Sequence, residues 1–221
     1  MPTDPVGASW STGFEDRFCD YVAQSGFCYD AGNARYDIVQ SPVHSGRYAA
    51  AFTVNTEDGG DRHQARCVRQ GKLPTAAYYG AWYYIPEYAD TDGKVWNLLH
   101  FQGGDGPTDR LDNLWDVSLI NGDSNGLELV VYGSAAKKTL LPDVPTPVPI
   151  GSWFHIEMFF RRASDETGEI TIYQDGTELA STSGLVTDAT TFGQWYVGNY
   201  SDGITPPTSI LYVDDVSIRP E

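Results

Sequence analysis

The chain of 221 residues lacks the features of several common classes of protein. No apolar run approaches the length that spans a bilayer, and the start, MPTDPVGAS, lacks the basic and apolar regions of a signal peptide. Only 14 basic side chains stand against 30 acidic ones, giving a formal net charge of −16. Such a charge opposes general binding to nucleic acid or to an anionic membrane, so we expect neither as a partner. We expect a monomer.

Cysteine is also scarce, with only Cys19, Cys28 and Cys67. Cys19 and Cys28 are close enough in sequence to form a disulfide across a short loop in an oxidising compartment. Cys67 would then be unpaired. Three reduced, partly buried thiols are the alternative. No two cysteines have the spacing of zinc ligands, so structural zinc is not expected. The acidic composition, rich in Gly, Tyr and Trp, fits a secreted protein.

The sequence also lacks the pattern of an amphipathic helix, since no segment of a dozen residues repeats its apolar residues every 3.6 positions. Runs of period two, bounded by Gly, Pro, Asn and Asp, replace it. We therefore predict an all-β fold, an antiparallel β-sandwich jelly roll of two stacked curved sheets. Residues 1–12 are interpreted as a linker and 13–221 as one domain. The predicted strands are 47–54, 64–70, 76–86, 95–103, 114–121, 127–133, 153–162, 169–176, 194–200 and 210–218.

Two segments show how the sandwich is expected to form. The stretch 140–151, LLPDVPTPVPIG, carries four prolines and is predicted to be an extended loop that crosses an edge. The strand 153–162 alternates, so Phe154, Ile156, Met158 and Phe160 are predicted to point into the core. The opposite face then carries a mixed set that is either solvated or substrate-binding: Trp153, His155, Glu157, Phe159 and Arg161.

The stretch DRHQAR, residues 61–66, places Arg62, Gln64 and Arg66 at every second position. Period two puts all three on one face of a strand. Guanidinium and amide groups donate several hydrogen bonds to a carboxylate, so this face suits the binding of an acidic sugar.

The carboxy-terminal half resembles a known superfamily. The segments GSWFHIEMFF and GEITIYQDGTEL, followed by LYVDDVSI, are similar to the concanavalin A-like, or laminin G-like, jelly rolls. That superfamily includes lectins, carbohydrate-binding modules, glycoside hydrolases and polysaccharide lyases, so the fold does not choose a function. The Glu-x-Asp-x-x-Glu strand of the family 16 hydrolases is absent from the sequence.

Three motifs resemble those of alginate lyases and related polysaccharide lyases, a group to which the heparin-lyase-like enzymes also belong. Residues 62–66 are similar to their Arg-x-Glu-x-Arg strand, with Gln64 in place of Glu. HFQ, residues 100–102, is similar to their Gln-Ile-His strand in reversed order. QWYVGNY, residues 194–200, matches their Tyr-Phe-Lys-x-Gly-x-Tyr strand at Gly198 and Tyr200.

This resemblance implies a lyase that cleaves a uronate-containing glycan by β-elimination in a concave groove. Arg62, Arg66 and Gln102 would bind the uronate carboxylate, His100 would act as base, and Tyr200 as acid or as both acid and base. The further candidate substrate-binding residues are Gln64, Tyr196, His155, Glu157 and Trp153.

Two other functions stay open on the sequence. One is a non-catalytic carbohydrate-binding module of a secreted polysaccharide-degrading protein, in which aromatic rings stack on sugars. The other is a laminin G-like adhesion domain. The tryptophans that could serve a binding module are Trp82, Trp96, Trp115, Trp153 and Trp195.

The resemblance also implies a structural calcium ion. In several relatives a calcium ion joins the first and last strands, and Glu15, the Gly46 carbonyl and Asp214 occupy comparable places here. Oxygen ligands of this kind suit calcium. A charged strand edge at Asp214, with Glu15 as a surface acid, is the alternative.

Overall fold

The computed structural model of the protein describes residues 9–15, 26–60, 62–106, 110–122 and 126–221. Every regular element in these ranges is a β-strand, as the period-two pattern predicts. The described residues contain no helix long and apolar enough to cross a membrane. The strands are β1 (Trp10–Thr12), β2 (Gly26–Ala31), β3 (Ala34–Val39), β4 (Ala49–Asn55), β5 (His63–Gly71), β6 (Ala76–Tyr84), β7 (Trp96–Gly104), β8 (Asp112–Asn121), β9 (Leu127–Gly133), β10 (Lys138–Leu140), β11 (Trp153–Arg161), β12 (Gly168–Gln174), β13 (Thr177–Leu185), β14 (Phe192–Ser201) and β15 (Thr208–Pro220).

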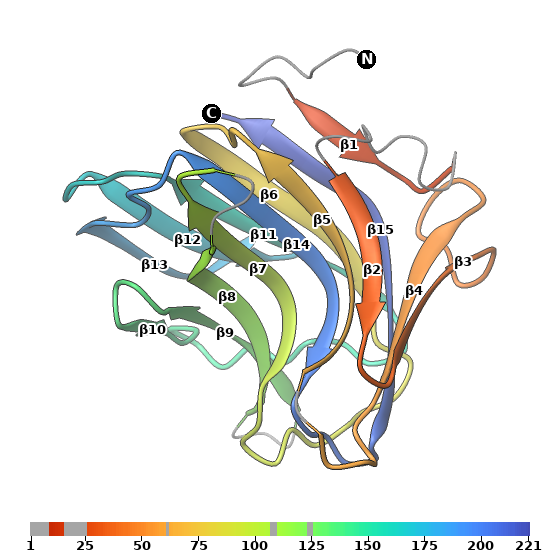
Figure 1. Ribbon diagram of the computed structural model, residues 1–221. Helices are drawn as coiled ribbons and strands as arrows, with labels where there is room; N and C mark the ends of the chain where they lie inside the picture. The colour runs from red at the N-terminus through yellow and green to blue at the C-terminus, as the bar shows by residue number, and fades with distance from the viewer. Residues whose placement is uncertain (1–8, 16–25, 61, 107–109, 123–125) are drawn as a thin grey trace.

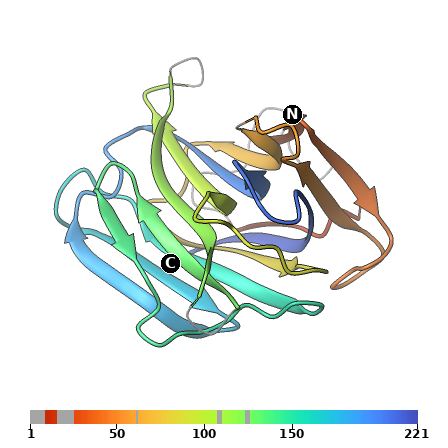
Figure 2. The same ribbon diagram turned by 90° about the horizontal axis from the view of Figure 1, so that it is seen from below.

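The strands form two antiparallel sheets that lie one on the other (Figures 1 and 2). Sheet A has the order β13-β12-β11-β6-β15-β4-β3, with β1 paired to β15. Sheet B has the order β10-β9-β8-β7-β14-β5-β2, and its strands are visibly curved in Figure 1. Neighbours such as β14 and β5 are far apart in sequence, so the predicted jelly roll of two curved sheets is confirmed.

The core fills the space between the two sheets. The four residues predicted to point inward from β11 are completely buried, which confirms the alternation of that strand: Phe154, Ile156, Met158 and Phe160. Phe160 of sheet A packs edge to face against Phe101 of sheet B, with ring centroids 4.7 Å apart. Tyr79 and Trp195 form a second aromatic pair across the sheets at 5.2 Å. These contacts fix how the sheets stack.

All ten predicted strands are present with ends shifted by a few residues, and five further strands are added. The added strands are β1, β2, β3, β10 and β13. The last of these, TELASTSGL, is mostly polar and lies at a sheet edge, and its buried Leu179 and Ala180 are consecutive, so it lacks an apolar alternation that could mark it. Strand β1 includes residues 10–12, so sheet A begins within the segment interpreted as a linker.

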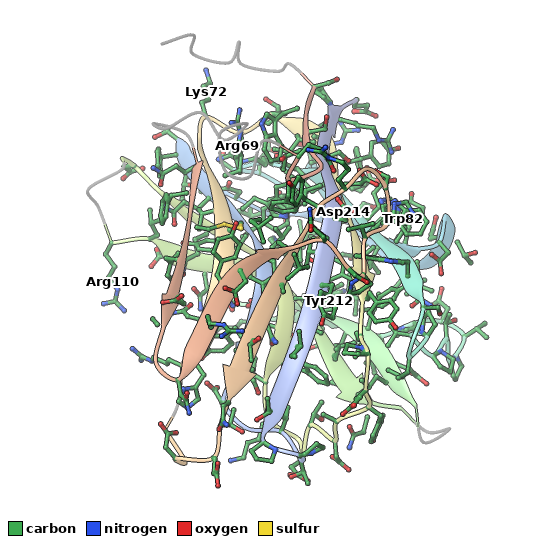
Figure 3. The ribbon with its side chains drawn as sticks, turned by 90° about the vertical axis from the view of Figure 1, so that its right-hand side faces the viewer. Arg69, Lys72, Trp82, Arg110, Tyr212 and Asp214 are labelled. Carbon is green, nitrogen blue, oxygen red and sulfur yellow. A yellow bond between two sulfur atoms is a disulfide. The ribbon has the colours of Figure 1, made fainter. Side chains whose placement is uncertain are left out.

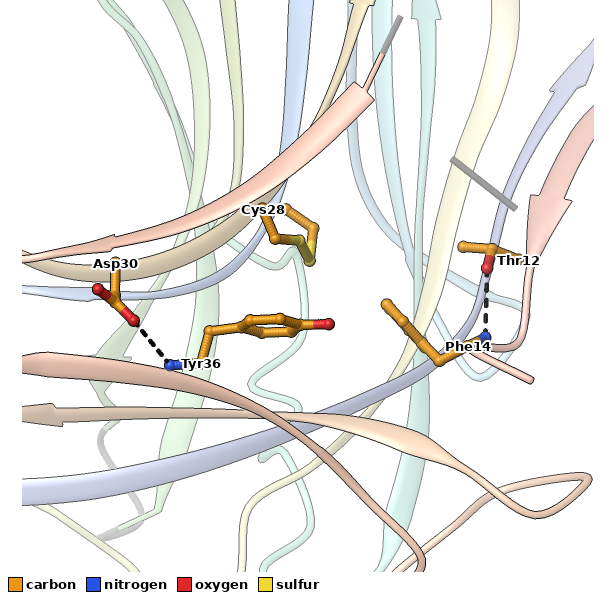
Figure 4. Close-up of a disulfide and its surroundings, with 6 residues drawn as sticks. Thr12, Phe14, Cys28, Asp30 and Tyr36 are labelled. Carbon is orange, nitrogen blue, oxygen red and sulfur yellow. Dashed lines mark hydrogen bonds between the residues drawn. A yellow bond between two sulfur atoms is a disulfide. The ribbon is translucent and has the colours of Figure 1, made fainter. Parts of the chain in front are cut away.

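The disulfide differs from both alternatives considered from the sequence, a Cys19–Cys28 bridge and three reduced thiols. Cys28 of β2 bonds to Cys67 of β5, its direct neighbour in the antiparallel register (Figure 4). Cys67 is therefore neither unpaired nor a reduced thiol, because sheet pairing rather than closeness in sequence brings it to Cys28. Cys19, the other half of the predicted bridge, lies outside the described residues.

The proline-rich segment 141–151 connects β10 of sheet B to β11 of sheet A, as expected of a loop that crosses an edge. The Val148 amide donates to the Leu127 carbonyl at 2.7 Å, which ties the segment to the start of β9. The loop therefore joins the two layers without adding a strand.

Candidate functional site

A groove of about 650 Å³ lies on the outer, concave face of sheet B. Six of the residues predicted to bind or cleave a uronate line it: Arg62, Gln64, Arg66, His100, Gln102 and Tyr200. They come from β5, the residue before it, β7 and β14, and these three strands are adjacent in the sheet. The other residues that line it are Val95, Asn97, Asn113, Asp116, Ser118 and Tyr132.

His100 of β7 stands opposite Asp116 of β8 in the strand register. Its Nδ1 is hydrogen-bonded to Asp116 Oδ1, so the carboxylate orients the ring and favours the tautomer with the proton on Nδ1. Nε2 has no hydrogen-bond partner among the described residues, while the side chain borders the groove. Burial lowers the pKa of His100, and Asp116 partly opposes this. The imidazole is therefore neutral near pH 7, with a nitrogen lone pair free to accept a proton.

A β-bulge in β7 brings Asn97 to the same face as His100. The register against β8 shifts between Asn97 and Leu99. Because of this bulge, Asn97 and His100 share a face although they are three positions apart. The Asn97 amide donates to Asp116 Oδ1 at 3.1 Å, and its Oδ1 accepts from Arg66 Nη2 at 2.7 Å. Asn97 thus links the His100–Asp116 pair to the nearest cation.

Arg66 is a nearly buried cation beneath two aromatic rings. Its guanidinium carbon lies 4.7 Å from the ring centroid of Tyr200 and 5.4 Å from that of Tyr196. Burial lowers the pKa of Arg66, with Tyr29 and Asp116 opposing. Even with a lowered pKa, a guanidinium remains far more basic than water at pH 7, so Arg66 stays charged at neutral pH. Among the described residues it makes no salt bridge, so its charge is available to an anion in the groove.

Tyr200 is brought to the groove by an unusually close approach of β14 to β5. A Cβ atom at Gly198, where φ is +150°, would lie 2.3 Å from the Ala65 carbonyl oxygen, so only glycine fits. The Tyr200 hydroxyl donates to Asp202 Oδ1 at 2.7 Å. Burial raises the pKa of Tyr200, and the bond to Asp202 raises it further. The phenol is therefore protonated at neutral pH and can act as an acid.

The remaining predicted groove residues form a chain of amides and phenols. Tyr196 donates to Gln102 Oε1 at 2.8 Å and also contacts Gln194, so it supports the groove floor rather than lining the cavity. Gln64 accepts from the Tyr29 hydroxyl at 3.2 Å. The Arg62 amide donates to Asp202 Oδ1 at 3.2 Å, in a backbone conformation with φ of +74° that is uncommon outside glycine.

Trp153, His155 and Glu157 do not join this set, which corrects the expectation that they bind the same substrate. All three lie on β11 of sheet A and point away from the core, on the side of the molecule opposite the groove. Glu157 is paired with Arg219 at 2.5 Å. In Figure 3, which faces the right-hand side of Figure 1, Trp82 of sheet A and Arg110, which precedes β8 of sheet B, lie on opposite sides of the molecule.

The tryptophans divide in the same way. Trp96, Trp115 and Trp195 are buried in the core, so they cannot stack on a sugar. Trp82 is stacked on His44, with ring centroids 3.8 Å apart. Of the five candidates for a binding module, only Trp82 and Trp153 reach a surface, and it is not the surface of the groove.

The predicted calcium residues lie together near the first and last strands. Glu15 Oε1 accepts from the amides of Arg47 and Tyr48 at 2.7 and 3.1 Å, beside Gly46. Asp214 is fully buried and accepts from three backbone amides. No group of three or more His, Cys, Asp or Glu in the described ranges could hold a metal ion. An ion here would need carbonyl or water oxygens besides the two carboxylates, and it stays a prediction.

The sequence missed two residues that shape the site. Asp116 belongs to the predicted strand LWDVSLIN, where alternation places it with Ser118 on the face opposite Trp115 and Val117. A carboxylate on the outer face of a strand is a weak signal, because such residues are usually solvated. Asn97 gave no signal, because simple alternation places it on the face opposite His100.

Comparison with known proteins agrees with this architecture. A sequence model of the family described as Polysaccharide lyase matches residues 10–217. The structure is similar to endo-β-1,4-glucuronan lyase from the fungus Trichoderma reesei, with 17% identity, a TM-score of 0.70, and coverage of 98% of this chain and 96% of that one.

Two further structures show the same fold. The protein named Cellulose induced protein, Cip1, has 14% identity and a TM-score of 0.62, covering 94% of this chain and 95% of its own. The marine PL-14 alginate lyase from Aplysia kurodai has 13% identity and a TM-score of 0.61, covering 98% and 100%. A search of curated proteins finds no match.

Proposed function

We propose that the groove cleaves a uronate-containing glycan by β-elimination. The premise is that this chain belongs to the family described as Polysaccharide lyase. The observation that carries the proposal is the convergence of Arg66, His100 and Tyr200 on one groove of about 650 Å³. The three groups match the three tasks of the reaction, which are neutralising a carboxylate, removing a proton and protonating a leaving group.

Arg66 binds the uronate carboxylate in this proposal, with Arg62, Gln64 and Gln102 as further donors. Neutralising the carboxylate stabilises the negative charge that develops when the C5 proton leaves. A well-placed donor of this kind contributes about 3–4 kcal/mol to transition-state stability. Arg66 makes no salt bridge among the described residues, since its hydrogen-bond partners there are the neutral groups Asn97 and Tyr29, while Asp116 contributes a longer-range electrostatic interaction.

His100 Nε2 takes the C5 proton, and the Tyr200 hydroxyl gives a proton to the oxygen that leaves C4. The electrons of the C5–H bond form the C4=C5 double bond as the C4–O bond breaks. Both groups are in the protonation states that these roles need, because burial lowers the pKa of His100 and keeps it neutral, and raises the pKa of Tyr200 and keeps it protonated. The raised pKa makes Tyr200 a weaker acid than a free phenol, so the assignment of roles rests on the positions of the two groups in the groove.

We also propose that the protein works in an oxidising compartment, outside the cytosol. The Cys28–Cys67 disulfide supports this, because such bonds form and persist chiefly in secreted and periplasmic proteins.

The test is to incubate the protein with uronate polymers, such as polyglucuronate and alginate, and with neutral polysaccharides. We expect absorbance from the conjugated C4=C5 double bond with at least one uronate polymer and with no neutral one. Binding of glycans without any unsaturated product would favour the non-catalytic binding module. Absence of both product and binding would favour the adhesion domain.

A further inference from the structure

The groove is chemically different on its two sides. Among the described residues that line the groove, two are cations. Arg66 lies in β5, and Arg62 is the residue before that strand. The side formed by β8 and β9 has no cation in that set. Its lining residues are Asn113, Asp116, Ser118 and Tyr132.

The strand register places Tyr132 at a fixed distance from the reaction centre. Tyr132 of β9 pairs with Asp116 of β8, Asp116 with His100 of β7, and His100 with Tyr196 of β14. Strands in a sheet are about 4.8 Å apart, so Tyr132 lies about 10 Å from His100 and about 19 Å from β5 along the sheet. A sugar that contacts Tyr132 is therefore a different unit from the one held between Arg66 and His100.

Tyr132 has the properties of a platform for a sugar ring. Its side chain is 39% exposed and lines the groove, whereas most aromatic rings of the protein are packed in the core or against neighbours. Stacking on an aromatic face needs no charge on the ligand. A single exposed aromatic residue is common on protein surfaces, but this one lies in the same cross-strand row as His100.

A carboxylate on the sugar at Tyr132 would meet no cation among the residues that line the groove. Asp116 is the charged lining residue on that side and the lining cations are on the far side, while Lys137 and Lys138, beside Tyr132 in the neighbouring hairpin, are exposed and do not line the groove. The protein as a whole carries a formal net charge of −16, which repels a polymer with a charge on every unit. Screening limits these interactions to about 8 Å at physiological ionic strength, so the cations at β5 give little help at Tyr132.

We infer that the substrate is a glycan in which uronates are separated by neutral sugars, with the uronate at Arg66 and a neutral sugar stacked on Tyr132. This inference rests on the proposed function and adds the substrate class to it. Such a glycan differs from a homopolymer of uronate, for which each subsite along the groove would have to accept a carboxylate.

The first experiment compares gellan and hyaluronan, in which neutral sugars separate the uronates, with polyglucuronate and alginate. The measurement is kcat/KM for release of unsaturated product at low and at physiological salt. We expect kcat/KM to be at least tenfold higher for one of the mixed polymers than for the homopolymers. Added salt should raise kcat/KM more for the homopolymers than for the mixed polymers. Equal or better cleavage of a homopolymer at both salt concentrations would overturn the inference.

The second experiment alters the platform. Tyr132→Ala should lower kcat/KM for the preferred mixed polymer about tenfold through lost stacking, while Tyr132→Arg should shift the preference toward polyglucuronate. Tyr88→Ala is the matched control, because Tyr88 is 40% exposed and does not line the groove. An effect of Tyr132→Arg that is equal on both polymer types would also overturn the inference.

The failure of the proposed function has a different signature. If no polymer yields unsaturated product, the lyase proposal fails, and binding of gellan and polyglucuronate oligosaccharides then tests the subsite by calorimetry. Weaker binding of gellan fragments by Tyr132→Ala, with no change for polyglucuronate, would support a neutral-sugar subsite. Unchanged binding of both would reject it.

Discussion

The outer faces of the two sheets carry similar side chains yet differ in what those side chains can do. On sheet A, Arg219 pairs with Glu157 at 2.5 Å and Arg161 with Glu221 at 2.8 Å. On sheet B, Arg66 is held by the neutral amide of Asn97 and makes no salt bridge among the described residues. Arginine on the first face stabilises the surface, whereas arginine on the second can bind an anion.

Histidine shows the same contrast. His155 on sheet A lies beside Trp82, with ring centroids 5.2 Å apart, while its pKa is lowered mainly by burial. His100 on sheet B has a lowered pKa as well, but it is oriented by Asp116 and borders a groove. A lowered pKa alone therefore does not mark a catalytic base, because a base also needs an oriented ring and room for a substrate.

The largest expected effect comes from removing the proposed acid. Tyr200→Phe should lower the rate of unsaturated product formation by about 10²–10⁴-fold, because it removes one proton transfer. Binding of oligosaccharides should remain nearly intact. The matched change on sheet A, Tyr212→Phe, should leave activity within about twofold, since Tyr212 lies on the other side of the molecule. Equal losses in the two variants would show that the groove has no special role.

A smaller effect is expected from Asp116→Asn. The carboxylate raises the pKa of His100, so its removal should lower that pKa further. Activity depends on neutral His100, so it should fall only as pH drops through the lowered pKa of His100, and at still lower pH in the variant. The rate on the plateau should fall at least about tenfold because the ring loses its orienting bond. A pH profile of kcat/KM that does not move would exclude His100 as the base.

The smallest expected effect concerns the predicted calcium ion. If Glu15 and Asp214 help to hold calcium, the protein in calcium at 100-fold its Kd should melt about 5–10 °C higher than the protein with a chelator. Asp214→Asn should be less stable and should no longer respond to the chelator. Lyase activity measured well below the melting temperature should change little, because the site is remote from the groove. No thermal response in the wild type, together with no copurifying metal, would remove this prediction.

Much of the site could be predicted because alternation assigns a strand residue to a face. Arg62, Gln64 and Arg66 were placed on one face by their spacing, and the structure puts all three on the groove. Trp153, His155 and Glu157 were also correctly placed on an outer face, but of the other sheet. Spacing along a strand gives no information about which sheet the strand joins.

The sequence by itself determined the strands, the buried face of β11 and the kinds of groups available for chemistry. These depend on the period of two and on residue type, which are local properties. Tertiary structure decided which groups meet. The bulge at Asn97–Leu99, the pairing of His100 with Asp116 and the bond between Cys28 and Cys67 all depend on strand order and register. Register is set by the packing of residues distant in sequence, because a shift of one residue would expose a whole buried face.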